Sequence, residues 1–197
     1  IRINKDFVFN EMIKYLYKKE RLPAIAFVFS RKQAQKFAEK VELSLYPANS
    51  KIPSIIEKEC QQILMKLPNY KEYIELPEYK TIIKLLKKGI AVHHAGIPQI
   101  FRELIEQLFD KNYVKLLCAT ETFAVGINMP TKSVIFPSIS KFDGIGFRPL
   151  MSHEYSQMAG RAGRRGIDKF GDIYHLSNLI LSKNDAPDAN AYRLILD

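Results

Sequence analysis

Residues Ala24–Phe29 read Ala-Ile-Ala-Phe-Val-Phe, an uninterrupted apolar run of the length of a strand. Such a run is typical of a strand that is buried on both faces within a parallel sheet. Helical spacing of apolar residues precedes it over residues 7–20, and a second helix follows it, with Ala34 and Phe37 facing the core. This alternation predicts an α/β fold with a mostly parallel sheet and helices on both of its faces.

The same alternation continues along the chain. The clearest helix follows residue 96, because apolar residues from Ile97 to Phe109 form one continuous stripe. Asn112 tolerates a left-handed backbone, and we expect it to end this helix. Further short strands are predicted within residues 89–94, 114–119, 133–136 and 171–176.

One segment breaks this rhythm. Residues 46–88 are rich in Lys, Glu and Pro, and two helices are predicted within them, over residues 53–67 and 78–88. Paired charges and irregular apolar spacing predict a helical insertion that lies on the domain rather than forming part of its core. We expect one domain over residues 1–181, followed by residues 182–197 as a linker and the start of a truncated element.

Composition restricts the class of protein. The 197 residues are 47% hydrophobic and 11% aromatic, as in a folded globular domain, and the formal net charge is +9. This charge favours an anionic partner, with nucleic acid as the first candidate. Two cysteines exclude a disulfide scaffold and fit a reducing interior, and no run is long enough to span a membrane.

The ends and the residue usage give two further expectations. The chain starts without Met and without a signal peptide, so we expect it to be a piece of a longer intracellular protein. Lys outnumbers Arg, and Ile, Asn and Tyr are plentiful, which indicates an AT-rich genome and is compatible with a viral or protist source.

Residues 157–166 read Gln-Met-Ala-Gly-Arg-Ala-Gly-Arg-Arg-Gly, and they hold the strongest candidate site. If the helix that starts at Ser152 extends to this point, Arg161 and Arg164 leave from one face of it. The glycine before each arginine leaves space for a ligand or for backbone. Each guanidinium can donate two parallel hydrogen bonds to phosphate, so the pair suits a polyphosphate; a solvated basic turn is the alternative interpretation.

Polar residues follow two of the predicted strands at the point where each strand ends. Ser30 and Arg31 follow the first strand, and Thr120 follows the strand within residues 114–119. Ligands of open α/β sheets bind at the carboxyl ends of the strands, so these residues are candidates for phosphate contacts. The alternative for Ser30, which is compatible with a phosphate contact, is a helix N-cap.

His93 and His94 stand side by side near the end of another predicted strand. Neighbouring strand residues point to opposite faces, and no third ligand has a suitable spacing, so no metal site is predicted. We interpret residues 94–96 as a turn whose backbone N–H groups can approach a phosphate at a helix start. We expect this turn to share one edge of the sheet with the arginines of residues 157–166.

Three stretches together resemble the second RecA-like domain of a DExH-box helicase of superfamily two, in particular that of the Ski-like, exosome-associated RNA helicases. Residues 27–31 resemble motif IV, residues 119–130 resemble motif V, and residues 157–166 resemble motif VI. The resemblance covers nearly the whole chain, including the helical insertion. It implies a RecA-like fold.

The resemblance also implies roles for matching residues. Arg161 and Arg164 would be arginine fingers that reach the γ-phosphate of ATP, and Gln157 would couple the nucleotide to the domain interface. Gly126 and Asn128 belong to motif V and would face the bound nucleotide.

A second group of matching residues would hold the phosphates of single-stranded RNA. These residues are Ser30, Arg31, Ala95, Gly96 and Thr120. Contacts to phosphate rather than to bases would make binding largely independent of sequence.

Two motifs of an ATPase are absent from the 197 residues: there is no Gly-x-x-x-x-Gly-Lys-Ser/Thr stretch and no adjacent Asp-Glu pair. The resemblance therefore assigns the phosphate cradle and the Mg²⁺ site to a first RecA-like domain of the same polypeptide. We predict that these residues alone hydrolyse no ATP.

The intact protein is expected to be an ATP-dependent RNA helicase that moves 3′→5′ on single-stranded RNA. We expect it in the nucleus or the cytoplasm, within an RNA-decay complex and away from membranes. A DNA-unwinding helicase of the same superfamily and a non-catalytic nucleic-acid-binding scaffold are the alternatives. Stimulation of the ATPase by RNA or by DNA distinguishes the first alternative, and a first domain without the phosphate-loop lysine would favour the second.

Overall fold

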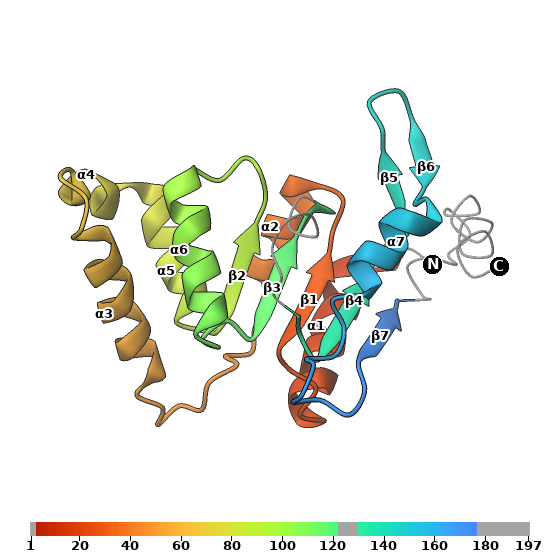
Figure 1. Cartoon of the computed structure of the whole chain (residues 1–197), viewed down its shortest axis with the longest axis horizontal. Helices are drawn as coiled ribbons and strands as arrows, with labels where there is room; N and C mark the ends of the chain where they lie inside the picture. The colour runs from red at the N-terminus through yellow and green to blue at the C-terminus, as the bar shows by residue number, and fades with distance from the viewer. Residues whose placement is uncertain (1–2, 122–129, 177–197) are drawn as a thin grey trace.

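The computed structural model describes residues 3–121 and 130–176. Their main sheet has five strands in the order β2-β3-β1-β4-β7, and each neighbouring pair is parallel (Figure 1). Strands β1 to β4 are buried along their whole length, whereas β7 is a partly exposed edge strand. The bounds are β1 Ala24–Phe27, β2 Ile90–His93, β3 Leu116–Ala119, β4 Ser133–Phe136 and β7 Asp172–His175.

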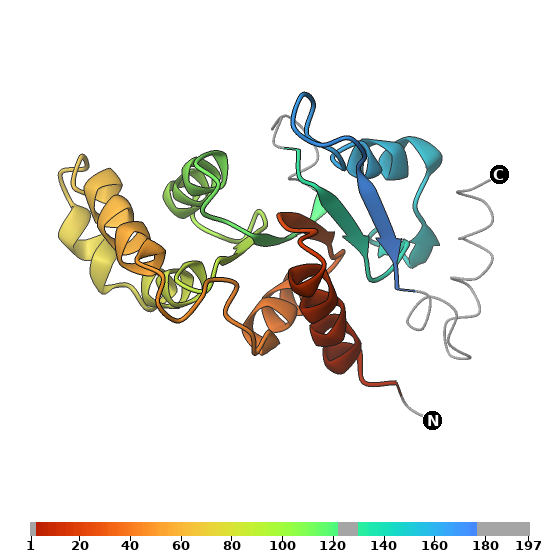
Figure 2. The ribbon, with the colours of Figure 1, turned by 90° about the horizontal axis from the view of Figure 1, so that it is seen from below.

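Helices cover both faces of this sheet (Figure 2). On one face α1 and α2 pack together, and the rings of Phe9 and Phe37 stack at 4.4 Å between centroids. On the other face, Leu104 of α6 and Met158 of α7 join one core cluster with Phe136 of β4. The bounds are α1 Lys5–Lys18, α2 Arg31–Lys40, α3 Ile52–Leu64, α4 Tyr70–Glu75, α5 Pro77–Leu86, α6 Gln99–Asp110 and α7 Ser152–Ala159. The predicted α/β fold is confirmed.

The predicted insertion contains α3, α4 and α5, so the six-residue α4 adds to the two helices that the sequence predicts. Ile56, Cys60 and Leu64 recur every four residues along α3 and are fully buried, as is Leu86 of α5. These side chains belong to the same core cluster as Phe101 of α6. The expectation that this segment lies outside the core is therefore wrong, because its charged residues occupy the outer sides of helices whose inner sides are apolar.

Two predicted helix boundaries depend on named side chains. Ser30 caps α2, since its Oγ accepts a hydrogen bond from the backbone N–H of Gln33 at 3.2 Å. Asn112 follows α6 with a φ of 63°, the left-handed conformation that was predicted for it. Within residues 3–121 and 130–176, no helix has both the length and the apolar character that crossing a membrane requires.

A separate two-stranded hairpin projects beyond the carboxyl ends of the main strands (Figure 1). It pairs β5 Ser140–Phe142 with β6 Phe147–Pro149 in antiparallel register. Its turn has four residues, and Oδ1 of Asp143 accepts hydrogen bonds from the N–H groups of Ile145 at 2.9 Å and Gly146 at 3.0 Å. The side chain of Asp143 thus closes the turn of this hairpin.

Candidate functional site

Helix α7 brings the chain back across the sheet, from the carboxyl ends of the strands to their amino ends (Figure 1). It ends at Ala159, so Arg161 and Arg164 lie in the loop beyond it. The N–H of Thr131 donates to the carbonyl of Arg161 at 2.9 Å, and the N–H of Gly163 donates to the carbonyl of Thr131 at 2.7 Å. Because Thr131 comes two residues before β4, this arginine loop, residues 160–168, lies at the amino edge of the sheet.

This position corrects two expectations from the sequence. The arginines do not leave from a face of the helix, and they do not share an edge with the residues that follow the carboxyl ends of the strands. The reason is one of length: an eight-residue helix is about 12 Å long, and a four-residue strand spans about 13 Å. One helix of this length therefore crosses the sheet from one edge to the other.

Gly171, which directly precedes β7, fixes the arginine loop from its other side. A Cβ at this position would lie 2.4 Å from the carbonyl carbon of Ala162 and 2.5 Å from the backbone nitrogen of Gly163. Glycine alone fits here, because real Cβ atoms essentially never come within 3.0 Å of such atoms. Gly163 itself has a left-handed φ of 89°. The loop is therefore held between Thr131 and Gly171.

Within the loop, the side chain of Asp168 fixes that of Arg164. Nε of Arg164 donates to Oδ2 at 2.7 Å, and Nη2 donates to Oδ1 at 2.9 Å. The side chain of Arg164 is 22% exposed and that of Asp168 only 5% exposed. The guanidinium lowers the pKa of Asp168 to about 2, and the carboxylate raises the pKa of Arg164.

The other predicted nucleotide-facing residues lie around this loop or outside the described residues. Gln157 is exposed on the last turn of α7, and Arg161 is partly exposed. Arg165 is exposed. Gly126 and Asn128 lie outside the described residues.

A cavity of about 240 Å³ lies beside Arg164 at the amino edge. Its wall includes Pro23, which precedes β1, and Asn112 and Val114, which precede β3. Burial, and then the nearby Arg164 guanidinium, lower the pKa of Lys115, which indicates a positive field at this edge. Guanidinium donors in a positive field suit the oxygens of a phosphate. They do not suit Mg²⁺, which is a cation and prefers oxygen ligands.

The carboxyl edge brings together the residues that were predicted to contact nucleic acid. Ser30 and Arg31 follow β1, Ala95 and Gly96 follow β2, and Thr120 follows β3, and these three strands are neighbours in the sheet. Nη1 of Arg31 would lie 3.4 Å from a Cβ built on Gly96, so the two residues are side by side. Ser30, Arg31, Ala95 and Gly96 are exposed. The edge therefore presents the hydroxyl of Ser30 and the guanidinium of Arg31 to solvent.

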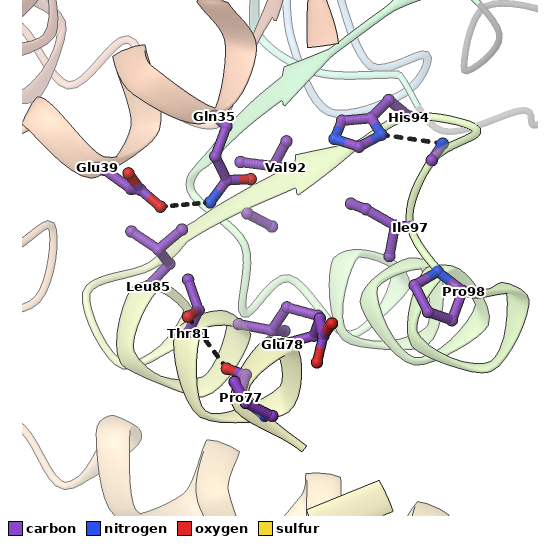
Figure 3. Close-up of a pocket in the computed structure, with 13 residues that line it drawn as sticks. Gln35, Glu39, Pro77, Glu78, Thr81, Leu85, Val92, His94, Ile97 and Pro98 are labelled. Carbon is purple, nitrogen blue, oxygen red and sulfur yellow. Dashed lines mark hydrogen bonds between the residues drawn. The ribbon is translucent and has the colours of Figure 1, made fainter. Parts of the chain in front are cut away.

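His94 uses one of the backbone amides that the sequence assigned to a phosphate. The N–H of Gly96 donates to Nδ1 of His94 at 3.0 Å (Figure 3). Burial, and then the charge of Arg31, lower the pKa of His94, which favours the neutral imidazole that can accept this bond. Helix α6 starts three residues after Gly96 and has Pro98 as its N-cap, so the expectation that the turn lies at a helix start is wrong.

His93 points to a different partner from His94. Its Nε2 lies 2.7 Å from Oε1 of Glu106 on α6, and its side chain is 4% exposed. Burial lowers the pKa of His93. In the part of the chain that the structure describes, no three His, Cys, Asp or Glu side chains are grouped so that they could hold a metal ion.

A larger cavity of about 390 Å³ lies between α2, α5 and the chain that follows β2 (Figure 3). Leu85, Val92 and Ile97 form part of its apolar wall. Glu39 and Glu78 also line it, and their carboxylates disfavour an anion. This cavity therefore does not extend the set of candidate phosphate contacts at the carboxyl edge.

Ion pairs fix the base of the hairpin to the start of α7. Glu154 accepts from Nη1 and Nη2 of Arg148, both at 2.9 Å, and from the N–H of Met151 at 2.8 Å. Lys141 lies 2.5 Å from Glu154 and 2.5 Å from Glu121, in the segment that follows β3. The Arg148 guanidinium holds the pKa of Glu154 well below its usual range. One network thus joins the hairpin, α7 and the end of β3.

Sequence reasoning missed three residues that shape these sites, although each has a local signal. Asp168 stands four residues after Arg164, the spacing of an ion pair within one turn. Gly171 is the first residue of a predicted strand, and a glycine in a strand often marks close approach of another backbone. Glu154 stands three residues after the N-cap Met151, the position of the acidic residue in a capping box.

Comparison with known proteins places the chain in a family. A family model described as the helicase conserved C-terminal domain matches residues 47–166, which include most of the arginine loop. The chain is 47% identical over 163 residues to the "Antiviral helicase SKI2" of Saccharomyces cerevisiae, which covers 83% of the chain and 12% of that protein.

Two further relatives match over more of the chain. Identity is 38% over 190 residues to the "Superkiller complex protein 2" of Mus musculus, covering 96% of the chain and 15% of that protein. Identity is 36% over 184 residues to the "ATP-dependent RNA helicase mtr4" of Schizosaccharomyces pombe, covering 92% of the chain and 16% of that protein. The chain thus spans only 12% to 16% of the length of these relatives. It belongs to the helicase conserved C-terminal domain family, among the Ski2- and Mtr4-like DExH-box RNA helicases.

Proposed function

We propose that this chain completes the ATPase site of an RNA helicase by supplying Arg161 and Arg164 to an ATP that another domain holds. The first RecA-like domain of the intact protein would bind the triphosphate and its Mg²⁺. The observation that carries this proposal is the arginine loop, which Thr131 and Gly171 pin at the amino edge and in which Asp168 orients a guanidinium. Charges that are fixed in place before the reaction stabilise a transition state best.

The energetics favour this division between two domains. An arginine that is supplied to a phosphoryl transfer increases the rate by about 10³–10⁵, because it meets charge that develops in the transition state. When the cradle and the arginines lie on different domains, hydrolysis requires the domains to close. Gln157 lies on the last turn of the helix that leads to the loop, and it would couple nucleotide binding to domain closure, while Gly126 and Asn128 would face the nucleotide.

The carboxyl edge would bind the nucleic acid strand through its phosphates. Ser30 offers a hydroxyl and Arg31 a guanidinium, and Ala95, Gly96 and Thr120 lie beside them at the ends of neighbouring strands. The net charge of +9 supports an anionic partner such as a nucleic acid. Binding through phosphates alone would be largely independent of sequence.

The separation of the two edges supports a coupled mechanism. Thr120 follows β3 at the carboxyl edge, which would hold the nucleic acid, and Thr131 precedes β4 at the amino edge, which would face the nucleotide. The two edges are therefore close together in the sequence. ATP binding and release would then switch the protein between two states that hold the nucleic acid through different contacts. Repeated alternation would move the protein along the strand in the 3′→5′ direction.

The choice of RNA as substrate rests on the relatives. The names "ATP-dependent RNA helicase mtr4" and "Superkiller complex protein 2" describe an RNA helicase and a member of a complex. We extend these properties to the intact protein, which would act on single-stranded RNA within an RNA-decay complex in the nucleus or cytoplasm.

The test is the steady-state ATPase rate of the intact protein with single-stranded RNA and with DNA of the same sequence. We expect greater stimulation by RNA, and a loss of about 10³-fold or more in stimulated kcat for Arg164→Ala. Lys169→Ala, a change of an exposed cation just beyond the arginine loop, is the control and should remain within a few-fold of the wild type by comparison with that loss. Greater stimulation by DNA would favour the DNA helicase, and an inert wild type would favour the scaffold.

The 197 residues alone are expected to hydrolyse no ATP, since they lack the phosphate-loop motif. Adding a separately produced first domain, or testing the full-length protein, should restore turnover. Sustained turnover by the pure domain would contradict the assignment of the ATP cradle to another domain.

A further inference from the structure

The turn that contains Arg164 is closed by both main-chain and side-chain bonds. The N–H groups of Ile167 and Asp168 donate to the carbonyl of Arg164 at 3.0 and 2.9 Å. The N–H of Arg164 donates back to Oδ2 of Asp168 at 2.9 Å. The carboxylate of Asp168 therefore binds the backbone and the side chain of the same arginine, and it does so while almost fully buried.

The way in which Asp168 holds the guanidinium leaves part of it available. A guanidinium has five N–H donors, and the bonds to Asp168 use the one on Nε and one on Nη2. The two donors on Nη1 and the second donor on Nη2 lie on the edges that face away from the carboxylate. Arg164 can thus donate to Asp168 and to a second anion at the same time.

We propose that Asp168 is a positioning residue for the arginine finger. It holds Arg164 by the Nε–Nη2 edge, so that the remaining donors are presented to the γ-phosphate when the domains close. This inference rests on the proposed function of Arg164 and deepens it, by naming the group that orders the finger before ATP arrives.

Two effects of Asp168 oppose each other, and the geometry decides between them. The carboxylate reduces the net positive charge that a phosphate meets, which by itself would slow hydrolysis. It also removes the rotational freedom of a long side chain, which would otherwise have to be ordered during the reaction. The pair is bidentate, and a third bond anchors it to the backbone, so we expect ordering to outweigh the loss of charge.

A double-mutant cycle in the intact protein tests this inference. Asp168→Ala should lower the RNA-stimulated kcat about 10- to 100-fold with the KM for ATP within about three-fold, because the change acts on the transition state. In the background of Arg164→Ala, the same change should alter kcat less than about two-fold, since Asp168 would act only through the missing guanidinium. Glu11→Ala is the control: this exposed carboxylate forms an ion pair with Lys14 on α1, outside both proposed sites, and kcat should not change.

The outcomes separate the inference from the function on which it rests. Full turnover by Arg164→Ala would refute the function of the finger and this inference with it. If Arg164→Ala is impaired, then an unchanged or raised kcat for Asp168→Ala refutes the inference alone. An equal loss in the Arg164→Ala background also refutes it, because that result assigns Asp168 a role in folding.

Thermal unfolding accompanies each assay. If Asp168→Ala unfolds at the assay temperature, Asp168→Asn replaces it, because the amide keeps the size and one acceptor of the carboxylate. Asp168→Asn should then lower kcat by a smaller factor than that predicted for Asp168→Ala, with a smaller loss of melting temperature. A wild-type kcat for Asp168→Asn in a folded protein would refute the need for the bidentate bond.

Discussion

Replacement of Gly171 by alanine tests whether the arginine loop must be held against the start of β7. The added methyl group would meet the peptide group between Ala162 and Gly163, namely the carbonyl carbon and oxygen of Ala162 and the nitrogen of Gly163. None of these atoms can turn aside as the end of a flexible side chain can. The change therefore forces the loop and the strand apart.

The size of the effect follows from the contact distances. The nearest contact would have to lengthen from 2.4 Å to more than 3.0 Å. Overpacking of a rigid site costs about 1–3 kcal/mol, and a misplaced catalytic group, shifted by on the order of 1 Å, loses about 10²-fold in rate. We expect Gly171→Ala to lower the melting temperature and to lower kcat by about 10²-fold if the loop shifts by this amount.

The assay compares melting temperature and RNA-stimulated ATPase of the intact protein for Gly171→Ala and Gly146→Ala. A Cβ at Gly146, in the hairpin turn, would have no heavy atom within 4 Å, so this second change controls for the added methyl group. It should leave both measurements close to those of the wild type. A Gly171→Ala protein with wild-type melting and wild-type kcat would refute the reasoning.

Three further changes probe other parts of the account. Asn112→Ala should lower the free energy of unfolding, measured in urea, by about 1–2 kcal/mol, because the backbone φ at this position is 63°. Asn112→Gly should lower it less, and equal stability of the two variants would contradict a left-handed cap. Glu154→Ala should remove the bidentate partner of Arg148 and one of the two carboxylates beside Lys141, and so increase hydrogen exchange in the hairpin; unchanged exchange would contradict the anchoring role of the network. Burial lowers the pKa of His93, His94 and His175 below 6.5, so the unfolded chain binds more protons as the pH falls. Stability should therefore be complete above pH 6.5 and decrease as the pH falls through the folded-state pKa values, and a melting temperature that rises in that range would contradict this sign.

The sheet could be predicted because its central strands are continuous apolar runs. Residues Ala24–Phe27 and Leu116–Ala119 are fully buried, and burial on both faces removes the polar residues that would obscure a strand. Helix α6 could be predicted for a related reason, since its stripe from Phe101 to Phe109 faces a single surface. These features depend on local patterns of hydrophobicity.

The arrangement of the sites depended on facts that no local pattern contains. The edge at which the arginine loop lies is set by the direction and length of α7, and the polar residues in the sequence do not reveal these. Gly171, just before β7, contacts Ala162 in the arginine loop, and the two residues are too far apart in the sequence for a local pattern to reveal this contact. The burial of α3 depends on its packing against α6, so the charges along the segment concealed a core helix.

The central claim is that this domain supplies positive charge to an ATP that another domain holds. Single-turnover hydrolysis of bound ATP, at saturating single-stranded RNA, tests it most directly in the intact protein with Arg161 and Arg164 both changed to alanine. The account predicts that hydrolysis slows by about 10³-fold or more. It also predicts that RNA affinity without nucleotide is unchanged, because the proposed RNA contacts lie at the opposite edge of the sheet. Hydrolysis at the wild-type rate would contradict the account.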